Sequence, residues 1–451
     1  MNLPGDLEKA TFTTDWKANW GSADGDDFAG AVMDNSGNIY FTGSTLPDGY
    51  QGNIFLTKIN YSTKTVAWSR SFDAGAQDWM PSPSENGHSQ GGGGSRCIAI
   101  DASGDVYIAG SSSQGFNEVF VVKVNSAGTV VWQKFWKVGS SAVASSSADG
   151  YALDVAAGKV FVTGASGAGN VFVLVLDAST GNVDANTQQG IDPSPGYNDR
   201  GYTIRTLDGI NIYVAGWEGD NNSGFVMKLS GGGSTLDWCK RVDVDWAARL
   251  TDMELDATGN LYLAADLRGV STYMGIVKID ASGNLVWSKK YQGLSNDRNN
   301  ISCLRIINNT IYVGGRGSFE NYDTGQWGDG CFIKMDLDGN LLSQFNFFTG
   351  ELTDDKCGER IEAILSYNGT LVLIGETWSE YNGIDGYWYV ANGTLVDHAT
   401  SVSNVSSPGF QTGDGYVTST AFNVSNLTYT LTPTSSGSHG SADVEFFSIT
   451  E

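Results

Sequence analysis

The sequence is poor in charge, proline, histidine and cysteine. Only 17% of its 451 residues are charged, and it holds 8 prolines, 3 histidines and 5 cysteines. The cysteines are odd in number, lie far apart and form no C-x-x-C pair, which argues against a disulfide framework or a zinc site. We expect them to be small buried side chains of a chain folded in a reducing compartment: Cys97, Cys239, Cys303, Cys331 and Cys357.

Basic residues and long apolar runs are also scarce. Lys and Arg total 26 against 50 Asp and Glu, which gives a net charge of −24 and a pI near 4.3. This balance argues against a nucleic-acid partner. No run approaches the ~18 apolar residues of a membrane-spanning helix, and the first twenty residues lack the layout of a secretory signal. We therefore expect no membrane insertion and no cleaved leader.

Glycine and aromatic residues, by contrast, are abundant, and they recur in a repeat. The sequence has 59 glycines and 13 tryptophans, and this aromatic content excludes intrinsic disorder. One cassette, typified by GAVMDNSGNIYFTGST and CIAIDASGDVYIAGSS, appears seven times at intervals of about 50 residues. Its second apolar run ends in a small residue each time: Gly43, Gly110, Gly164, Gly216, Ala265, Gly315 and Gly375.

Each cassette has the pattern of short β-strands. Two apolar runs are joined by a turn such as D-x-x-G-N, which places glycine where positive φ is needed. A third run follows, and often a fourth with a central tryptophan: Trp68, Trp132, Trp238 and Trp287. Four short antiparallel strands repeated seven times predict an all-β, seven-bladed β-propeller with four-stranded antiparallel blades.

The cassette resembles a known repeat family. GNIYFTGST, followed by a K-x-[ND] strand and a V-x-W-S strand, is similar to the seven-bladed β-propeller repeats called SBBP repeats. The resemblance spans roughly residues 12–400 and rests on all seven copies. It implies the architecture of the ring and no particular activity.

The ends of the chain indicate how the ring closes. Residues 14–20, TDWKANW, resemble the tryptophan-bearing fourth strand but follow no third strand. We predict that they complete the last blade, whose first three strands would come from residues 359–391, with residues 394–402 as the competing segment. The cassette stops after Ser401, which predicts a propeller over residues 1–402 and a small β appendage over residues 403–451.

The two ends of the propeller are expected to differ. One end carries the tight turns, whereas the other carries long irregular loops, and variable loops on a rigid scaffold are where binding sites usually lie. Aromatic rings beside carboxylates and amides in these loops suit sugar recognition, with capping of the blades as the alternative. The candidate ligand-binding residues are Trp79, Trp217, Glu218, Asp220, Tyr322, Trp327, Trp378 and Tyr381.

Charged residues also recur just before the first strand of the cassettes. Recurrence at one repeat position favours ion pairs between blades around the central channel, and a positively charged mouth that binds an anion is the alternative. The residues are Asp27, Arg96, Asp149, Arg200, Arg249, Arg298 and Arg360.

No catalytic, metal-binding or cofactor-binding motif is found. His88, His398 and His439 have no neighbours at metal spacing, and no G-x-S-x-G elbow is present. The tryptophan repeats resemble those of quinoprotein dehydrogenases, but paired cysteines and an eighth repeat are missing, so we interpret the tryptophans as blade packing. Two alternatives are a calcium ion in the loop at Glu218, Asp220 and Asn221, and a carboxylate pair among Asp354, Asp355 and Glu359.

These observations predict a protein that binds or assembles and is not an enzyme. Its acidity, its Gly/Ser/Thr/Asn content and the missing leader favour a bacteriophage virion component in a tail, fibre or capsid surface. Its partners would be other virion chains or a host-surface glycan. The alternative is an extracellular or cell-surface propeller that binds carbohydrate, and the third hypothesis is a glycan-degrading or quinoprotein enzyme.

Overall fold

The computed structural model describes most of the repeat region and parts of both ends. The described residues are 13–21, 26–45, 53–63, 65–72, 78–81, 96–112, 118–136, 148–167, 169–191, 193, 198–219, 223–243, 248–267, 273–291, 300–317, 329–347, 357–379, 409–412, 424–425 and 443–450.

Within these residues the strands form seven antiparallel sheets. The first contains β2 (Asp26–Met33), β3 (Asn38–Thr45), β4 (Asn53–Asn60) and β5 (Thr65–Phe72). The second contains β6 (Asp78–Trp79), β7 (Ile98–Ile100), β8 (Val106–Ser112), β9 (Glu118–Val124), β10 (Val130–Trp136) and β30 (Val424–Ser425). The third contains β11 (Ala148–Ala156), β12 (Lys159–Ser166), β13 (Val171–Asp177) and β14 (Gln188–Ile191).

The remaining sheets follow the same order along the chain. The fourth contains β15 (Arg200–Arg205), β16 (Ile212–Trp217), β17 (Gly224–Ser230), β18 (Thr235–Asp243) and β29 (Gly409–Thr412). The fifth contains β19 (Ala248–Leu255), β20 (Leu261–Leu267), β21 (Tyr273–Ile279) and β22 (Leu285–Tyr291), and the sixth β23 (Asn300–Ile307), β24 (Thr310–Gly317), β25 (Asp329–Asp336) and β26 (Leu341–Phe347). The seventh contains β27 (Cys357–Tyr367), β28 (Thr370–Ser379), β31 (Asp443–Thr450) and β1 (Thr13–Gly21).

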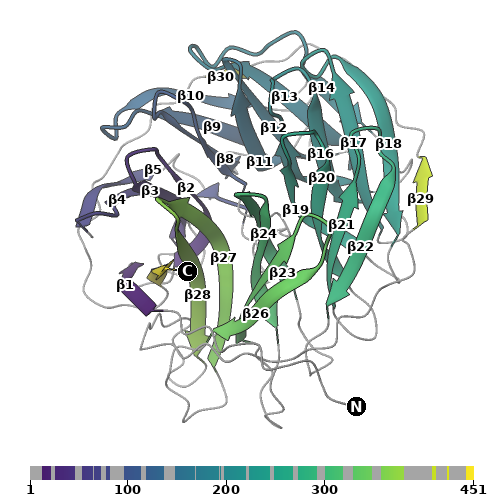
Figure 1. Cartoon of the computed structure of the whole chain (residues 1–451). Helices are drawn as coiled ribbons and strands as arrows, with labels where there is room; N and C mark the ends of the chain where they lie inside the picture. Colours follow the sequence, from purple (N-terminus) through teal and green to yellow (C-terminus); the bar gives the residue numbers. More distant parts are fainter. Residues whose placement is uncertain are drawn as a thin grey trace, which may run out of the picture.

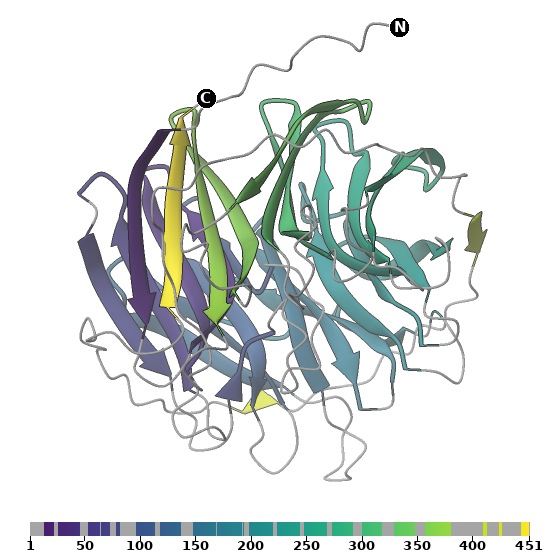
Figure 2. The ribbon, with the colours of Figure 1, turned by 90° about the horizontal axis from the view of Figure 1, so that it is seen from below.

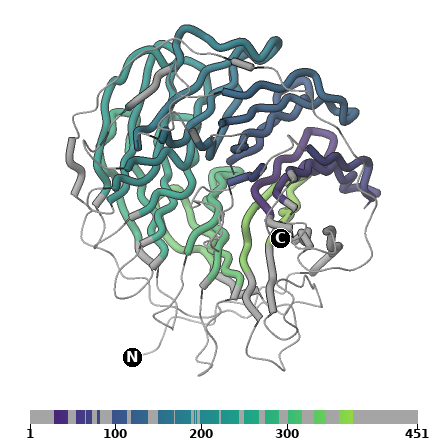
Figure 3. Tube along the Cα trace, turned by 180° about the vertical axis from the view of Figure 1, so that it is seen from behind, coloured from purple at the N-terminus to yellow at the C-terminus, as the bar shows by residue number. Residues whose placement is uncertain are grey.

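The sheets are arranged around a central axis. The innermost strands β2, β7, β11, β15, β19, β23 and β27 each contact the next in this order, and β27 contacts β2. Figure 3 follows the chain around this ring from β2 to β28. The prediction of an all-β propeller with four-stranded antiparallel blades is confirmed. No helix in the described part of the chain is long and apolar enough to cross a membrane.

The small residue at the end of each cassette permits a bulge in the innermost strand. In β11 and β15 the pairing register shifts just where the strand faces Gly164 and Gly216. A Cβ at Gly164 would lie 1.8 Å from the Asp149 carbonyl oxygen, and a Cβ at Gly216 would lie 1.8 Å from that of Arg200. The glycine is therefore required by close backbone approach, which explains its recurrence in the sequence.

The tight turns are held by their aspartates. Asp34 Oδ1 accepts hydrogen bonds from the backbone N–H groups of Ser36 and Asn38, and Gly37 has a φ of 78°. The Tyr40 hydroxyl donates to the same carboxylate at 3.2 Å. Equivalent bonds at Asp101 and Asp256 show that this residue shapes a turn in several repeats.

The repeated tryptophans join each blade to the next. The Trp68 Nε1 donates to the Ser126 carbonyl at 3.2 Å, Trp132 Nε1 to Ala178 at 3.1 Å and Trp287 Nε1 to Leu337 at 3.2 Å. Each acceptor lies in the turn between the third and fourth strands of the following sheet, and the turn glycine faces the indole there. These contacts support the interpretation of the tryptophans as blade packing. The apolar cores likewise lie between neighbouring sheets.

Both ends of the chain complete the last sheet. β1 is the outermost strand, as predicted, and pairs with β31 from Thr13↔Thr450 to Gly21↔Asp443. β31 also pairs with β28, so that it lies between β1 and β28 (Figure 2). The third strand of this sheet was predicted to come from residues near 387–391. That prediction is wrong, because β31 occupies the position between β28 and β1. Residues 387–391 and the competing segment 394–402 lie outside the described residues.

Other parts of the predicted appendage lie on the outside of the ring. β29 pairs with β18 at the edge of the fourth sheet, and β30 pairs with β10 at the edge of the second. The described strands of residues 403–451 therefore extend three sheets of the propeller.

Candidate functional site

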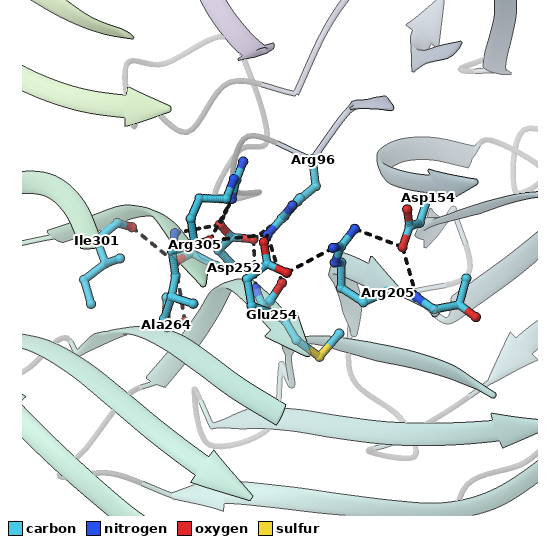
Figure 4. Close-up of polar contacts among 12 residues, drawn as sticks. Arg96, Asp154, Arg205, Asp252, Glu254, Ala264, Ile301 and Arg305 are labelled. Carbon is cyan, nitrogen blue, oxygen red and sulfur yellow. Dashed lines mark hydrogen bonds and ion pairs between the residues drawn. The ribbon is translucent and has the colours of Figure 1, made fainter. Parts of the chain in front are cut away.

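A network of buried ion pairs crosses the axis of the ring (Figure 4). Arg96, from the second sheet, places its Nε 2.7 Å from Asp252 Oδ1 and its Nη2 2.7 Å from Glu254 Oε1, both in the fifth sheet. The same Nη2 donates to the carbonyl of Leu304 in the sixth sheet at 3.3 Å. Arg96 therefore connects opposite sides of the ring.

Further charges extend this network around the axis. Arg205 Nη2 lies 3.0 Å from Glu254 Oε2, its Nη1 lies 3.0 Å from Asp154 Oδ2, and Arg305 Nη1 lies 2.9 Å from Asp252 Oδ2. Three arginines thus meet three carboxylates, and the group is neutral. We call it the axial plug: Arg96, Asp154, Arg205, Asp252, Glu254 and Arg305.

The plug keeps Glu254 ionised. Burial alone would raise the pKa of Glu254, but Arg205, Arg96 and Arg305 outweigh it and hold the pKa at about 2. Asp252 is fully buried and also accepts the N–H groups of Met253 and Leu304. These bonds satisfy the buried charges, as a low-dielectric site requires. The plug closes the axis and offers no excess charge to a ligand.

A second group of charges lies closer to the end with the long connections. Arg200 begins β15 and pairs with Trp217 at the end of β16, while Arg249 lies in β19 of the next sheet. The guanidinium carbons of Arg200 and Arg249 lie 5.7 and 5.4 Å from the centre of the Trp217 ring. All three side chains are partly exposed. We call this group the arginine mouth.

Aromatic side chains pack against the arginine mouth. Tyr151 and Tyr202 meet edge to face with ring centres 5.5 Å apart, and Trp217 packs against their cluster. Burial, aided by the charge of Asp149, raises the pKa of Tyr151. The tyrosine therefore stays protonated at neutral pH and offers an O–H group.

The neighbouring blades add more charge at the same level. Asp266 in β20 lies opposite Arg249 in β19 in the backbone pairing of these two strands. Burial raises the pKa of Asp266 to about 6, although Arg249, Arg360 and Arg316 oppose the shift. Arg360 also lies 3.4 Å from Glu362.

Arginines from four blades gather at this end of the axis within an acidic protein. Arg200, Arg249, Arg316 and Arg360 lie there among the carboxylates of Asp149, Asp199, Asp266 and Glu362. Five of the eleven arginines in the sequence lie on the innermost strands: Arg200, Arg205, Arg249, Arg305 and Arg360. The arginines that the alternative of a positively charged mouth requires are therefore present at this end.

The predicted ligand-binding residues are placed unevenly. Trp217 lies in the arginine mouth, whereas Glu218 is buried and bound to Arg241 with Oε2 2.6 Å from Nε. Trp79 lies in β6 and is partly exposed, and Trp378 belongs to the backbone of β28. The others, Asp220, Tyr322, Trp327 and Tyr381, lie outside the described residues, as do Arg298, Asp354 and Asp355.

Sequence reasoning missed most of the plug. It singled out Arg96 but not its partners Asp252 and Glu254. A signal was present, because Asp154, Arg205, Glu254 and Arg305 occupy one repeat position in four consecutive blades and alternate in sign. In the part of the chain that the structure describes, no group of three or more His, Cys, Asp or Glu residues is placed to hold a metal ion.

Comparisons with known proteins find similar structures but no family. No family model matches, and no curated protein matches. The structure of a PL25 ulvan lyase is 11% identical to this chain in sequence and has a TM-score of 0.49. The match covers 84% of this chain and 98% of the lyase chain. A Dyadobacter fermentans protein of unknown function is 12% identical with a TM-score of 0.44, and the match covers 88% of this chain and 100% of that chain. A Clostridium thermocellum α-L-arabinofuranosidase is 12% identical with a TM-score of 0.34, and the match covers 54% of this chain and 90% of that chain.

These matches change the functional interpretation of the sequence. The similar structures include polysaccharide lyases, an α-L-arabinofuranosidase and an endo-arabinanase. These findings contradict the prediction of a non-catalytic virion component. That prediction rested on acidity and on Gly, Ser, Thr and Asn content. The structure gives a local cause for part of the Asp and Gly content, since the tight turns use Asp and Gly and the bulges require Gly.

Proposed function

We propose that the protein binds an acidic glycan, one that carries carboxylate or sulfate groups, at the arginine mouth. The observation that carries the proposal is the contact of Arg200 and Arg249, from adjacent blades, with the single indole of Trp217. Distances below 6 Å lie in the range of cation–π attraction, which holds a guanidinium group in place.

Two guanidinium groups held in this way suit an anionic group on a ligand. A guanidinium that stacks on an aromatic ring keeps its N–H groups in its own plane, where they match the two oxygens of a carboxylate or sulfate. Because the groups are ordered before binding, less entropy is lost when the ligand arrives. A flexible surface lysine would lack both advantages.

The surrounding side chains suit a sugar. Tyr151, Tyr202 and Trp217 provide apolar ring surface beside hydroxyl groups, and saccharides present apolar C–H groups together with hydroxyls. An anionic sugar combines the two chemistries that the mouth offers. We expect neutral glycans to bind more weakly, because they offer no negative charge to the two arginines.

We further propose that the ring is of the seven-bladed SBBP type. The innermost strands of the seven described sheets close a cycle, and the repeated cassette supplies the first two strands and the turn of each blade. The tryptophan contacts between blades support the same assignment.

Calorimetric titration tests the binding proposal. Polygalacturonate and a sulfated glycan would be compared with neutral arabinan, using the wild type and the Arg200→Gln/Arg249→Gln variant. We expect the variant to lose at least about tenfold in affinity for the acidic glycans, since each charge-assisted bond contributes about 1.5–3 kcal/mol.

Arg70→Gln is the matched control. Its guanidinium carbon lies 5.4 Å from the centre of the Trp68 ring. The substitution therefore removes an arginine–tryptophan contact of the same kind at a site outside the mouth, and glycan binding should be unchanged. Equal affinity for arabinan and polygalacturonate, or an unchanged Arg200/Arg249 variant, would contradict the proposal.

A further inference from the structure

The innermost strand of the second sheet is divided into two parts. β6 pairs with the last part of β8, where Trp79 lies opposite Ser111, and β7 pairs with the first part, where Ile98 lies opposite Ile108. In the six other sheets one continuous strand fills both positions. The second blade therefore carries an insertion in its innermost strand, between Trp79 and Ile98.

This insertion places Trp79, and not Arg96, at the level of the arginine mouth. A Cβ at Gly110 would lie 2.7 Å from the Trp79 carbonyl oxygen, and the glycine at this position of the fourth blade approaches the carbonyl of Arg200 in the same way. Trp79 therefore occupies in the second blade the repeat position that Arg200 and Arg249 occupy in the fourth and fifth blades. Arg96, which follows the insertion, lies in the axial plug.

The Trp79 side chain is directed toward the third blade. Residues that lie opposite each other in an antiparallel pair project to the same side of the sheet, and Trp79 lies opposite Ser111. The Ser111 hydroxyl accepts a hydrogen bond from the backbone N–H of Gly150 in β11 at 3.2 Å. Met80, the next residue along the chain, packs into the core that the second sheet shares with the first. The side of the second sheet that carries Trp79 is therefore the side that contacts the third blade.

The third blade connects Trp79 to the arginine mouth. Ala165, at the same level in the third blade, belongs to the aromatic cluster against which Trp217 packs. Within this cluster the ring centres of Tyr151 and Tyr202 lie 5.5 Å apart across the boundary between the third and fourth blades. Contacts between consecutive blades therefore lead from Trp79 through the third blade to Trp217 and its two arginines.

The Trp79 indole is available to a ligand. It is partly exposed, and among the described residues it joins none of the apolar clusters and contacts no other aromatic ring. Trp68, Trp132 and Trp287, by contrast, each donate a hydrogen bond to the following blade. Trp79 thus presents a large ring with a polar N–H group at the mouth, and this kind of surface suits a sugar.

We propose that Trp79 forms a second sugar subsite, on which one sugar of the acidic glycan stacks while Arg200 and Arg249 hold its anionic groups. This inference rests on the proposed function and deepens it. The ligand is an extended segment of several sugars that crosses the mouth from the fourth and fifth blades to the second. Trp79 and Ser111 occupy this level in the second blade and neither is charged, so the stacked sugar is recognised by its apolar face and needs no anionic group.

Calorimetric titration with oligogalacturonates of increasing length tests this inference. In the wild type we expect the affinity to rise with length until the chain spans the mouth. Trp79→Ala should bind the long oligomers roughly fivefold to twentyfold more weakly than the wild type does, and the trimer equally well. Trp79→Phe is the matched control, since it keeps a ring, and it should lose at most about threefold. A loss that does not depend on length, or no loss at any length, would overturn the inference.

Oxidative footprinting of the wild type gives a result that does not depend on the folding of a variant. Hydroxyl radicals oxidise exposed indoles, and mass spectrometry locates the products. Long oligogalacturonates should protect both Trp79 and Trp217, whereas the trimer should protect Trp217 alone. Trp68, which is partly exposed on the outermost strand of the first sheet, should be oxidised equally with and without ligand. Oxidation of Trp79 that a bound long oligomer leaves unchanged would refute the second subsite.

The outcomes separate the two proposals. If Arg200→Gln/Arg249→Gln loses short and long oligomers while Trp79→Ala binds both as the wild type does, the proposed function stands and the second subsite fails. If the wild type binds no acidic glycan, the proposed function and the inference that rests on it both fail.

Discussion

At the scale of single residues, the position of a charge in the ring decides how much it contributes. Arg96 and Lys228 each pair with a carboxylate, but Arg96 is 9% exposed at its side chain and Lys228 is 21% exposed. Removing one partner of a buried pair leaves a charge without compensation, whereas an exposed pair contributes little. The axial plug should therefore be far more sensitive to substitution than the outer ion pairs.

We predict that Arg96→Met lowers the free energy of unfolding by about 3–5 kcal/mol, because Asp252 and Glu254 lose a buried partner. Lys228→Met, which breaks a 3.5 Å pair with Asp237, should cost at most about 1 kcal/mol. Urea unfolding of both variants provides the comparison. Similar losses of unfolding free energy in the two variants would show that the buried ion pairs of the plug contribute no more to stability than the outer pair does.

Asp266 should make stability fall as the pH rises. Its pKa is raised from 3.8 to about 6 in the folded protein, so the folded state binds an extra proton between these values and loses that advantage above pH 6. Glu254 acts in the opposite direction, since its lowered pKa stabilises the fold above about pH 4.5 and this contribution is lost toward pH 2.

We predict that Asp266→Asn removes the loss of stability between pH 4 and pH 7. A shift of about two units corresponds to roughly 3 kcal/mol. The variant should therefore gain up to this amount relative to the wild type as the pH is raised from 4 to 7. Urea midpoints at both pH values measure the difference, and parallel pH profiles for the two proteins would refute it.

At the scale of strands and blades, contacts between neighbouring sheets repeat along the ring. Trp287 of β22 reaches the carbonyl of Leu337 in the sixth sheet, and its indole covers Gly339 there. The neighbouring Val286 is 52% exposed on the same strand. Adjacent residues of one strand therefore differ sharply in what they contribute to blade packing.

We predict that Trp287→Ala costs about 2–4 kcal/mol, because it removes ring packing and a hydrogen bond between blades. Val286→Ala should change stability by at most about 0.5 kcal/mol. Hydrogen exchange would report faster exchange in β22 and β26 for the tryptophan variant alone. Equal exchange rates in both variants would contradict the role of Trp287 in packing one blade against the next.

At the scale of the whole molecule, closure depends on both ends of the chain. In the last sheet β31 lies between β1 and β28. β1 therefore joins the sheet only through a strand from the opposite end of the sequence. Loss of β31 would leave the ring with an incomplete blade and two open edges.

We predict that deletion of residues 443–451 opens the ring. The deletion should broaden urea unfolding, increase proteolysis of the first and last sheets and raise the radius of gyration. Deletion of residues 2–12, which keeps every described strand, is the control. A truncated protein that unfolds as cooperatively as the control would show that β31 is dispensable.

The net charge of −24 predicts an unusual salt dependence for acidic glycans. At 0.01 M salt the Debye length is about 30 Å, so the whole molecule repels a polyanion, whereas at 0.15 M it is about 8 Å and the arginine mouth acts alone. The association rate should therefore rise over this range, where a basic protein would show a fall. Stopped-flow measurements with polygalacturonate test the sign.

The sequence by itself determined the parts of this protein that depend on local pattern. Short alternating strands, turns such as D-x-x-G-N and a small residue facing each bulge specify four-stranded blades, because strand period and turn geometry are set within a few residues. The tryptophan positions and the outermost place of β1 follow from the same repeat. Each of these features is visible in a single cassette.

Only the tertiary structure decided which distant residues meet. Arg96 and Asp252 lie 156 residues apart, and Arg200, Trp217 and Arg249 come together only when two blades are packed side by side. The third strand of the last blade comes from residues 443–450, since an open sheet edge accepts any extended segment that reaches it. The physical reason is that charge pairing and edge pairing depend on distance in space, which becomes fixed only once the ring has closed.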